Sequence, residues 1–221
     1  MTAQGNLLDL GFREFTEVWD LQRKLLETRS NGRIPDTLIL VEHPHVFTVG
    51  KAVPGDLPPQ IDGVNVFRIE RGGQWTYHGP GQLVGYPILD LNQRNRDIHA
   101  FLAGIEETLI HAIGKFGIAG NRGEQTGVWV GRKKIASIGA AIRNWISFHG
   151  FALNVNTDLN YFYKINPCGF SGSTITSMQA ILGSEVDFNR VKNEVRNQFE
   201  KTFDLRLTQI RPEDLEQTAI I

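Results

Sequence analysis

Cys168 and Lys134 are the two residues of this chain whose chemistry would suit a nucleophile and its proton partner. Cys168 is the single cysteine and lies in the turn-forming stretch NPCG at 166–169. The thiolate is the reactive form of cysteine, and a nearby amine that exchanges protons with the thiol activates it. The stretch 174–182 predicts a short helix whose N-terminal amides would stabilise a thiolate or an oxyanion. A lone cysteine is also often a small buried apolar residue, and the residues alone leave that interpretation open.

Lys134 opens the stretch KIASIGAAI at 134–142, which predicts a β-strand. Alternation along this strand would place Lys134 on one face with Ala136 and Ile138. Burial among small apolar residues lowers the pKa of a lysine and makes its neutral amine available near pH 7. The alternative is an ordinary solvated lysine at the exposed end of the strand, beside Lys133, and alternation alone does not decide between the two.

A glycine-rich motif, RGGQWTYHGPGQLVGYPIL, fills residues 71–89. Gly72 and Gly73 follow a predicted strand, and glycine lets the backbone turn sharply and approach a ligand closely. The motif lacks the spacing of a dinucleotide fingerprint and the GK[ST] ending of a phosphate loop. A β-hairpin with a glycine-rich turn and a ligand pocket both remain, and the density of polar groups favours the pocket. These polar groups are Arg71, Thr76, Tyr77, His78 and Gln82.

The motif resembles the signature of the lipoyl(octanoyl) transferases, a family within the biotin and lipoate protein ligase superfamily. The resemblance is carried by Arg71, Gly72, Gly73, Thr76, Tyr77, His78, Gly81, Gln82 and Tyr86. The family also carries a lysine and an NPCG cysteine that act together as a catalytic dyad, and these fall on Lys134 and Cys168. The resemblance further implies a substrate-binding set made of Arg71, Gly72, Gly73, Gln74, Trp75, Thr76, Tyr77, His78, Ser137, Ile138, Gly139, Gly150, Phe151 and Ala152.

This resemblance implies an acyltransferase that needs neither ATP nor a cofactor. The octanoyl group would pass from octanoyl-acyl-carrier protein to Cys168 as a thioester, and then to a lysine ε-amine of a lipoyl domain. The implied acceptors are the lipoyl domains of 2-oxoacid dehydrogenase complexes and the glycine cleavage H protein, in the first step of lipoate biosynthesis on protein. Two alternatives stay open: an ATP-dependent lipoate or octanoate protein ligase, and a non-catalytic acyl or lipoyl-domain binding protein. A cysteine hydrolase is disfavoured, because no Cys/His/Asn order with a nucleophile on a helix is visible.

The histidines outside the motif carry weaker signals. His149 lies in a predicted strand, ISFHGFALNV, where it would either support the pocket or act as a base. His43 and His45 resemble half of a metal site, but no third ligand has a suitable spacing. We therefore expect no metal.

The periodicity of apolar residues predicts an α+β fold, and the resemblance implies the catalytic core of the biotin and lipoate protein ligases. We expect a single domain over residues 1–221, with its core at about 30–205, in which helices flank a mostly antiparallel or mixed sheet. The loop at 51–60 is expected to lie on its surface. Helices are predicted at 12–28, 97–116 and 187–203, and strands at 37–43, 46–50, 65–71, 82–89, 126–131, 134–142 and 146–155.

The amino-acid composition excludes several functional classes of protein. The 221 residues include 23 basic and 24 acidic side chains, so no bulk charge attracts the chain to nucleic acid or anionic lipid. Hydrophobic residues make up 41%, which is typical of a folded protein. We find neither a signal peptide nor an apolar run that could cross a bilayer. With one cysteine no intrachain disulfide can form, so we expect a cytoplasmic protein.

Overall fold

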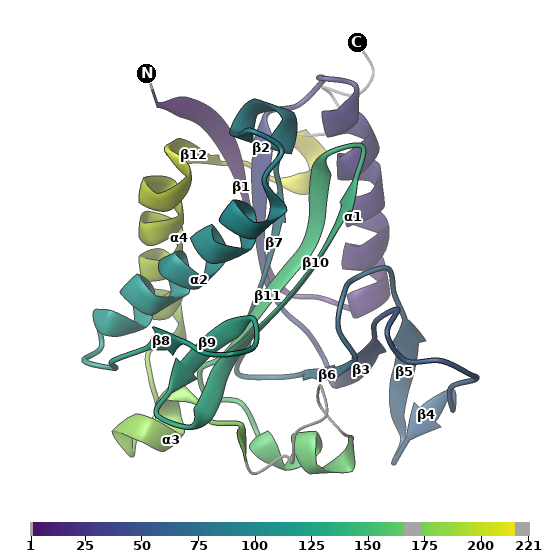
Figure 1. The fold of residues 1–221 in the computed structure, drawn as a ribbon, viewed down its shortest axis with the longest axis vertical. Coiled ribbons are helices and arrows are strands. Elements are labelled where there is room, and N and C mark those ends of the chain that lie inside the picture. The colour runs from purple at the N-terminus through teal and green to yellow at the C-terminus, as the bar shows by residue number, and fades with distance from the viewer. Residues whose placement is uncertain (1, 166–173, 215–221) are drawn as a thin grey trace.

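The fold is built on an eight-stranded sheet and a four-stranded sheet, with helices around them (Figure 1). The computed structural model describes residues 2–165 and 174–214. The larger sheet has the order β12–β1–β2–β7–β11–β10–β9–β8, and its strands are β1 (Ala3–Phe12), β2 (Asp36–Glu42), β7 (Gln82–Ile88), β8 (Asn121–Arg122), β9 (Gly127–Val130), β10 (Lys133–Arg143), β11 (Ile146–Asn154) and β12 (Leu205–Gln209). The smaller sheet has the order β4–β5–β3–β6, and its strands are β3 (Val46–Val49), β4 (Gln60–Ile61), β5 (Val64–Arg68) and β6 (Trp75–His78).

The larger sheet is mixed. Strands β12, β1 and β2 run parallel to one another, and the pairs from β2 to β8 are antiparallel. The predicted α+β class with a mostly antiparallel or mixed sheet is therefore confirmed. The helical elements are α1 (Phe15–Ser30), η1 (Leu91–Arg94), α2 (Ile98–Gly114), η2 (Leu159–Lys164), α3 (Met178–Leu182) and α4 (Phe188–Phe203).

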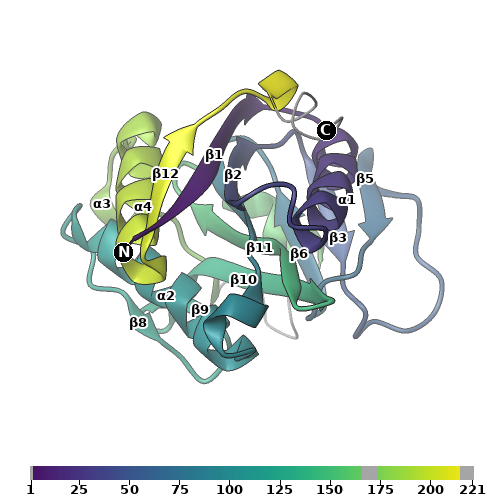
Figure 2. The ribbon, with the colours of Figure 1, turned by 90° about the horizontal axis from the view of Figure 1, so that it is seen from above.

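Helices cover both faces of the larger sheet (Figure 2). On one face, α2 and α4 bury apolar side chains such as Ile105 and Val195 against sheet residues such as Leu153. On the other face, α1 buries Val18 and Leu25 in a separate cluster with residues of β2 and β7. These amphipathic stripes produce the 3.6-residue period from which the three long helices are predicted. No helix within the described residues is long and apolar enough to span a membrane.

Side-chain caps determine where three of the helices begin. Asp97 accepts a hydrogen bond from the backbone of α2, as the sequence predicts, and Asp187 does the same for α4. The short helix expected from residue 174 begins only at Met178, where Ser177 is its cap. Ile175, which precedes it, instead forms a β-bridge with Lys134.

Candidate active site

A pocket lies between the larger sheet and the segment 71–78. Its floor is formed by β10 and β11, whose register pairs Ser137 with Ala152 and Gly139 with Gly150. All four residues line the pocket, and Gly139 and Gly150 allow Arg71 and the backbone of Gly85 to approach the floor closely. The residues that line the pocket are Phe15, Ile69, Arg71, Gly72, Gly73, Trp75, Thr76, His78, Tyr86, Lys134, Ser137, Ile138, Gly139, His149, Gly150, Phe151, Ala152 and Ile175.

Lys134 lies at one end of this pocket and is only 5% exposed. Simple alternation would place it on the face of Ala136, but the register of β10 against β9 shifts between these two residues. Both Ile135 and Ala136 pack into the core beneath α2 as a result, whereas Lys134 and Ser137 line the pocket. The expected shared face of Lys134 and Ala136 is therefore wrong, and of the two alternatives left open for Lys134 the structure shows the buried one.

Two residues that follow Cys168 in the sequence pair with the backbone of Lys134. Cys168 itself lies outside the described residues. Seven positions after it, Ile175 pairs with Lys134 in a β-bridge, and the next residue, Thr176, donates its backbone N–H to the Lys134 carbonyl at 2.9 Å. Ile175 and Thr176, which follow the predicted nucleophile in the sequence, therefore lie against the backbone of Lys134.

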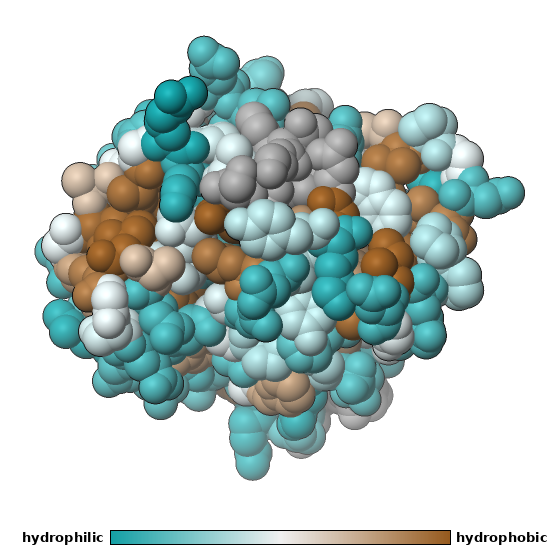
Figure 3. Space-filling view, turned by 90° about the horizontal axis from the view of Figure 1, so that it is seen from below, coloured by the Kyte–Doolittle hydropathy of each residue, from teal (hydrophilic) through white to brown (hydrophobic). Residues whose placement is uncertain are grey.

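Figure 3 shows the end of the molecule that carries η2 and α3, the two helical elements on either side of the Cys168 segment. Apolar side chains form separate patches there among polar ones. The exposed large apolar residues of these elements are Tyr163, Ile181 and Leu182.

The roof of the pocket is the first part of the glycine-rich motif. The Arg71 guanidinium donates to the carbonyls of Thr48 at 2.8 Å and of Gly72 at 2.9 Å, so it ties the roof to β3. The N–H of Gly72 donates to the Ala140 carbonyl at 3.2 Å, which ties the roof to β10. Gly73 has φ +81°, a conformation that favours glycine.

The rest of the motif divides between the pocket and the core. Thr76 and His78 alternate into the pocket along β6, and Trp75 also lines it. Tyr77 does not line it, because its fully buried ring stacks on Tyr161 of η2 at 4.7 Å. Gln74 is likewise absent from the lining. Tyr77 therefore anchors η2, the element that precedes the Cys168 segment.

His78 is held in one tautomer. Gln82 donates through Nε2 to both the Tyr77 carbonyl and Asn154 Oδ1, so its Oε1 accepts from His78 Nδ1 at 2.8 Å. Burial, helped by the neighbouring His43, lowers the pKa of His78 to about 3. His78 therefore stays neutral at physiological pH.

Hydrogen bonds also hold His43 in one tautomer. Its Nδ1 donates to the Arg13 carbonyl at 2.8 Å, so its Nε2 accepts from the Tyr86 hydroxyl at 2.9 Å. Burial lowers the pKa of His43 to about 4 and raises that of Tyr86. His45 instead hydrogen-bonds the Tyr77 hydroxyl at 2.7 Å. Within the residues that the structure describes, no group of three potential ligands could hold a metal ion.

His149 lies at the opposite end of the pocket from Lys134. It pairs with Ala140 across the sheet, six residues along β10 from Lys134, or about 20 Å at the rise of a strand. Its Nε2 lies 3.3 Å from Glu70 Oε2, and its φ of +55° interrupts the alternation of β11. Burial lowers the pKa of His149, and the hydrogen bond from His149 lowers that of Glu70. This position suits a residue that supports the pocket, not a base beside Lys134.

Several lining residues carry no signal in the sequence. Phe15 arrives from α1, Ile69 from the segment after β5, and Ile175 from the stretch before α3. The Phe15 ring stacks on His78 at 6.2 Å between centroids, which brings the first turn of α1 to the pocket wall. Only the packing of distant segments brings these residues together, so local periodicity could not identify them.

Comparison with known proteins agrees with the resemblance in the motifs. Residues 14–200 match the lipoyl protein ligase A/B catalytic domain. An octanoyltransferase of Geotalea uraniireducens is 45% identical over 201 residues, covering 90% of this chain and 93% of that protein. An octanoyltransferase of Thermoanaerobacter sp. is 40% identical and covers 99% of this chain and 97% of its own length.

Solved structures show the same fold at lower identity. A putative lipoate protein ligase from T. acidophilum with bound lipoic acid has a TM-score of 0.75 at 20% identity, covering 98% of this chain and 93% of its own. A biotin protein ligase from Aquifex aeolicus has a TM-score of 0.57 at 14% identity, covering 90% and 70% respectively. The chain belongs to the lipoyl protein ligase A/B catalytic-domain family, and within it the sequence matches octanoyltransferases over nearly its whole length.

Proposed function

We propose that this protein is an octanoyltransferase that moves an octanoyl group from octanoyl-acyl-carrier protein to a lysine of a lipoyl domain through a thioester on Cys168. The main support is a buried lysine in an apolar pocket, hydrogen-bonded through its backbone to the segment that follows the only cysteine. The octanoyltransferase names of relatives with 40 to 45% identity point to the same reaction. The acceptors are the lipoyl domains of 2-oxoacid dehydrogenase complexes and the glycine cleavage H protein.

In the first half-reaction, Cys168 transfers its proton to Lys134 and attacks the thioester carbonyl. The new bond joins the cysteine sulfur to the octanoyl carbon, and the bond to the phosphopantetheine sulfur breaks. Lys134 then gives its proton to the departing thiolate. One thioester replaces another, so this step needs no ATP.

In the second half-reaction, the ε-amine of the acceptor lysine attacks the acyl-enzyme. Lys134 takes the proton of the attacking amine, the new amide bond forms, and the bond between the octanoyl carbon and the Cys168 sulfur breaks. The proton on Lys134 balances the charge of the departing Cys168 thiolate. The oxyanion of both halves would be met by backbone N–H groups of the glycine-rich segments that contain Gly73 and Gly169. The octanoyl chain would lie in the pocket that Ser137, Gly139 and Ala152 line.

The test is intact-mass spectrometry after incubation with octanoyl-acyl-carrier protein. The wild type should gain the mass of one octanoyl group, and Cys168→Ser should gain none. Lys134→Ala should bind the donor but acylate at least about 100-fold more slowly. The matched control is Lys133→Ala, because Lys133 is the exposed neighbour on the same strand and should acylate normally.

Two outcomes would refute the proposal. An octanoyl adduct on Cys168→Ser would mean that another residue is the nucleophile. Transfer from free octanoate that requires ATP, with no transfer from the acyl-carrier thioester, would instead identify the ATP-dependent ligase, whose fold the solved structures share.

A further inference from the structure

A hydrogen-bonded pair, His149 and Glu70, lies at the end of the pocket away from Lys134. His149 lines the pocket and is 2% exposed, and its Nε2 donates to Glu70 Oε2 at 3.3 Å. At the same level of the sheet, the N–H of Gly72 donates to the carbonyl of Ala140, which is the cross-strand partner of His149. The roof and the floor of the pocket therefore meet beside this pair.

Helix α1 holds both members of the pair in place. The Glu70 carboxylate also accepts hydrogen bonds from Trp19 Nε1 at 2.9 Å and from the Arg23 guanidinium at 3.0 Å. Gln22 accepts the backbone N–H of His149 at 2.8 Å, and the φ of His149 is +55°. Because α1 contacts the carboxylate on one side and the His149 backbone on the other, the pair forms a fixed end wall.

A second hollow, the α1 groove, lies behind this end wall. It is lined by the apolar residues Leu26, Ala141, Ile142 and Phe148, and by charged groups that include Glu27 and Glu70. Glu70 lines the groove and not the pocket, whereas His149 lines the pocket and not the groove. The pair therefore separates two spaces that both have apolar walls.

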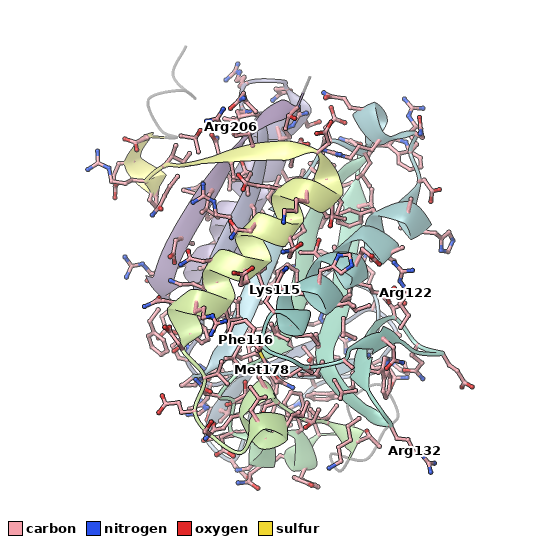
Figure 4. The ribbon with its side chains drawn as sticks, turned by 90° about the vertical axis from the view of Figure 1, so that its left-hand side faces the viewer. Lys115, Phe116, Arg122, Arg132, Met178 and Arg206 are labelled. Atoms are coloured by element: carbon pink, nitrogen blue, oxygen red, sulfur yellow. The ribbon has the colours of Figure 1, made fainter. Side chains whose placement is uncertain are left out.

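Three other hollows lie on the opposite face of the larger sheet. All three include Lys115, which Figure 4 shows beside α2 and α4. The pocket is on the face of α1, since Phe15 of that helix lines it. The sheet thus separates these hollows from the pocket, and the α1 groove is the space that continues it.

We propose that the Glu70–His149 pair limits the length of the acyl chain that the protein accepts, by closing the pocket against the α1 groove. The inference rests on the proposed function in taking the pocket as the acyl site. Each further carbon lengthens an extended chain by about 1.3 Å. A chain that passes the pair must displace the Glu70 carboxylate from its three donors and from water, to which its side chain is 35% exposed.

The pair also presents a suitable surface to the end of an apolar chain. Burial lowers the pKa of His149, and the hydrogen bond from His149 lowers that of Glu70. The pocket therefore meets a neutral imidazole ring, and the negative charge lies one layer behind it.

The test is calorimetric titration with saturated fatty acids from octanoate to tetradecanoate. Each methylene that leaves water tightens binding about fourfold, so the affinity of the wild type should rise with length up to a limit and fall beyond it. Glu70→Ala removes the carboxylate and opens the pocket to the α1 groove. Its limit should lie at least two carbons further, and those two methylenes should tighten binding about 15-fold.

A second variant and two controls isolate the pair. His149→Gly removes the ring at a φ that suits glycine, and its limit should also move to longer chains. Glu70→Gln keeps the length of the side chain and an oxygen that accepts from His149, so it should keep the wild-type limit. Glu27→Ala removes another carboxylate from the α1 groove and leaves the His149 hydrogen bond intact, so it should keep that limit too.

The possible outcomes separate this inference from the proposed function. The same limit in the wild type, Glu70→Ala and His149→Gly would overturn the role of the pair. A wild type without a limit up to tetradecanoate, or one that binds none of these acids, would overturn it as well. Absence of the octanoyl adduct in the intact-mass assay would refute the transferase, whereas a longer limit in Glu70→Ala would still support the pair.

Discussion

Acidification should destabilise this protein through the two buried histidines His43 and His78. Their pKa values in the folded state are about 4 and about 3, because burial disfavours the charged imidazolium. In the unfolded chain a histidine titrates near 6.5. Between these values the unfolded state binds protons that the folded state excludes, so stability is complete above about pH 7 and falls as the pH drops below 6.5.

The size of the effect at pH 5 follows from the same values. At that pH an unfolded histidine is almost fully protonated, whereas folded His43 and His78 remain largely neutral. Each residue then lowers the free energy of unfolding by about 2 kcal/mol relative to pH 8, or about 4 kcal/mol for the pair. This is a large part of the 5–15 kcal/mol that is typical of a folded domain.

Urea unfolding at pH 8 and pH 5, followed by circular dichroism, measures this loss. The free energy of unfolding should differ between pH 8 and pH 5 by about 2 kcal/mol less in His78→Gln than in the wild type. The reason is that the variant has one group fewer that binds a proton only in the unfolded state. His99→Gln, at an exposed position of α2, is the control and should keep the wild-type difference. If His78→Gln also keeps the full wild-type difference, then His78 is protonated in the folded state and the reasoning fails.

Two further substitutions test the packing around the site. Gly127→Ala should slow acylation by about 100-fold in the intact-mass assay, because its Cβ displaces the stem of Lys134. Gly114→Ala is the control and should acylate normally, because the Cβ that it adds meets no neighbouring atom within 4 Å. Asp36→Asn should lower the free energy of unfolding in urea by about 3 kcal/mol, since this buried carboxylate pairs with two arginines. Asp20→Asn, at an exposed ion pair, should change it by less than about 1 kcal/mol, and equal losses at the two aspartates would contradict the argument.

Local pattern was enough to predict the three long helices and the strands at the centre of the larger sheet. Their apolar residues repeat at the helix or strand period over many positions, and Asp97 and Asp187 mark two of the helix starts. The strands at residues 3–12 and 205–209 are among those that local pattern does not predict, as are β4, β6 and β8. The strand at 205–209 offers only two buried residues, Leu205 and Leu207, too few for alternation to be recognised.

The site was predictable where a motif carried it and not where tertiary packing built it. Family motifs identified Lys134 and most of the pocket lining, including Ser137 and Gly139. The side of the strand on which Lys134 lies depends on a bulge, and a one-residue shift in register is invisible to a simple count of alternating residues. The contribution of Phe15 depends on how α1 docks, which no local pattern encodes.

The parallel pairing of β1 with β12 has a consequence for synthesis on the ribosome. Ala3 pairs with Leu205, so the two strands are separated by roughly 200 residues of chain. The outer edge of β1 cannot be covered until β12 has been translated, whereas β2, its other neighbour, is available early. An uncovered strand edge is a template for pairing with other chains. The nascent protein therefore carries an aggregation-prone edge through most of its translation, and holding that edge until β12 emerges is a natural task for a chaperone.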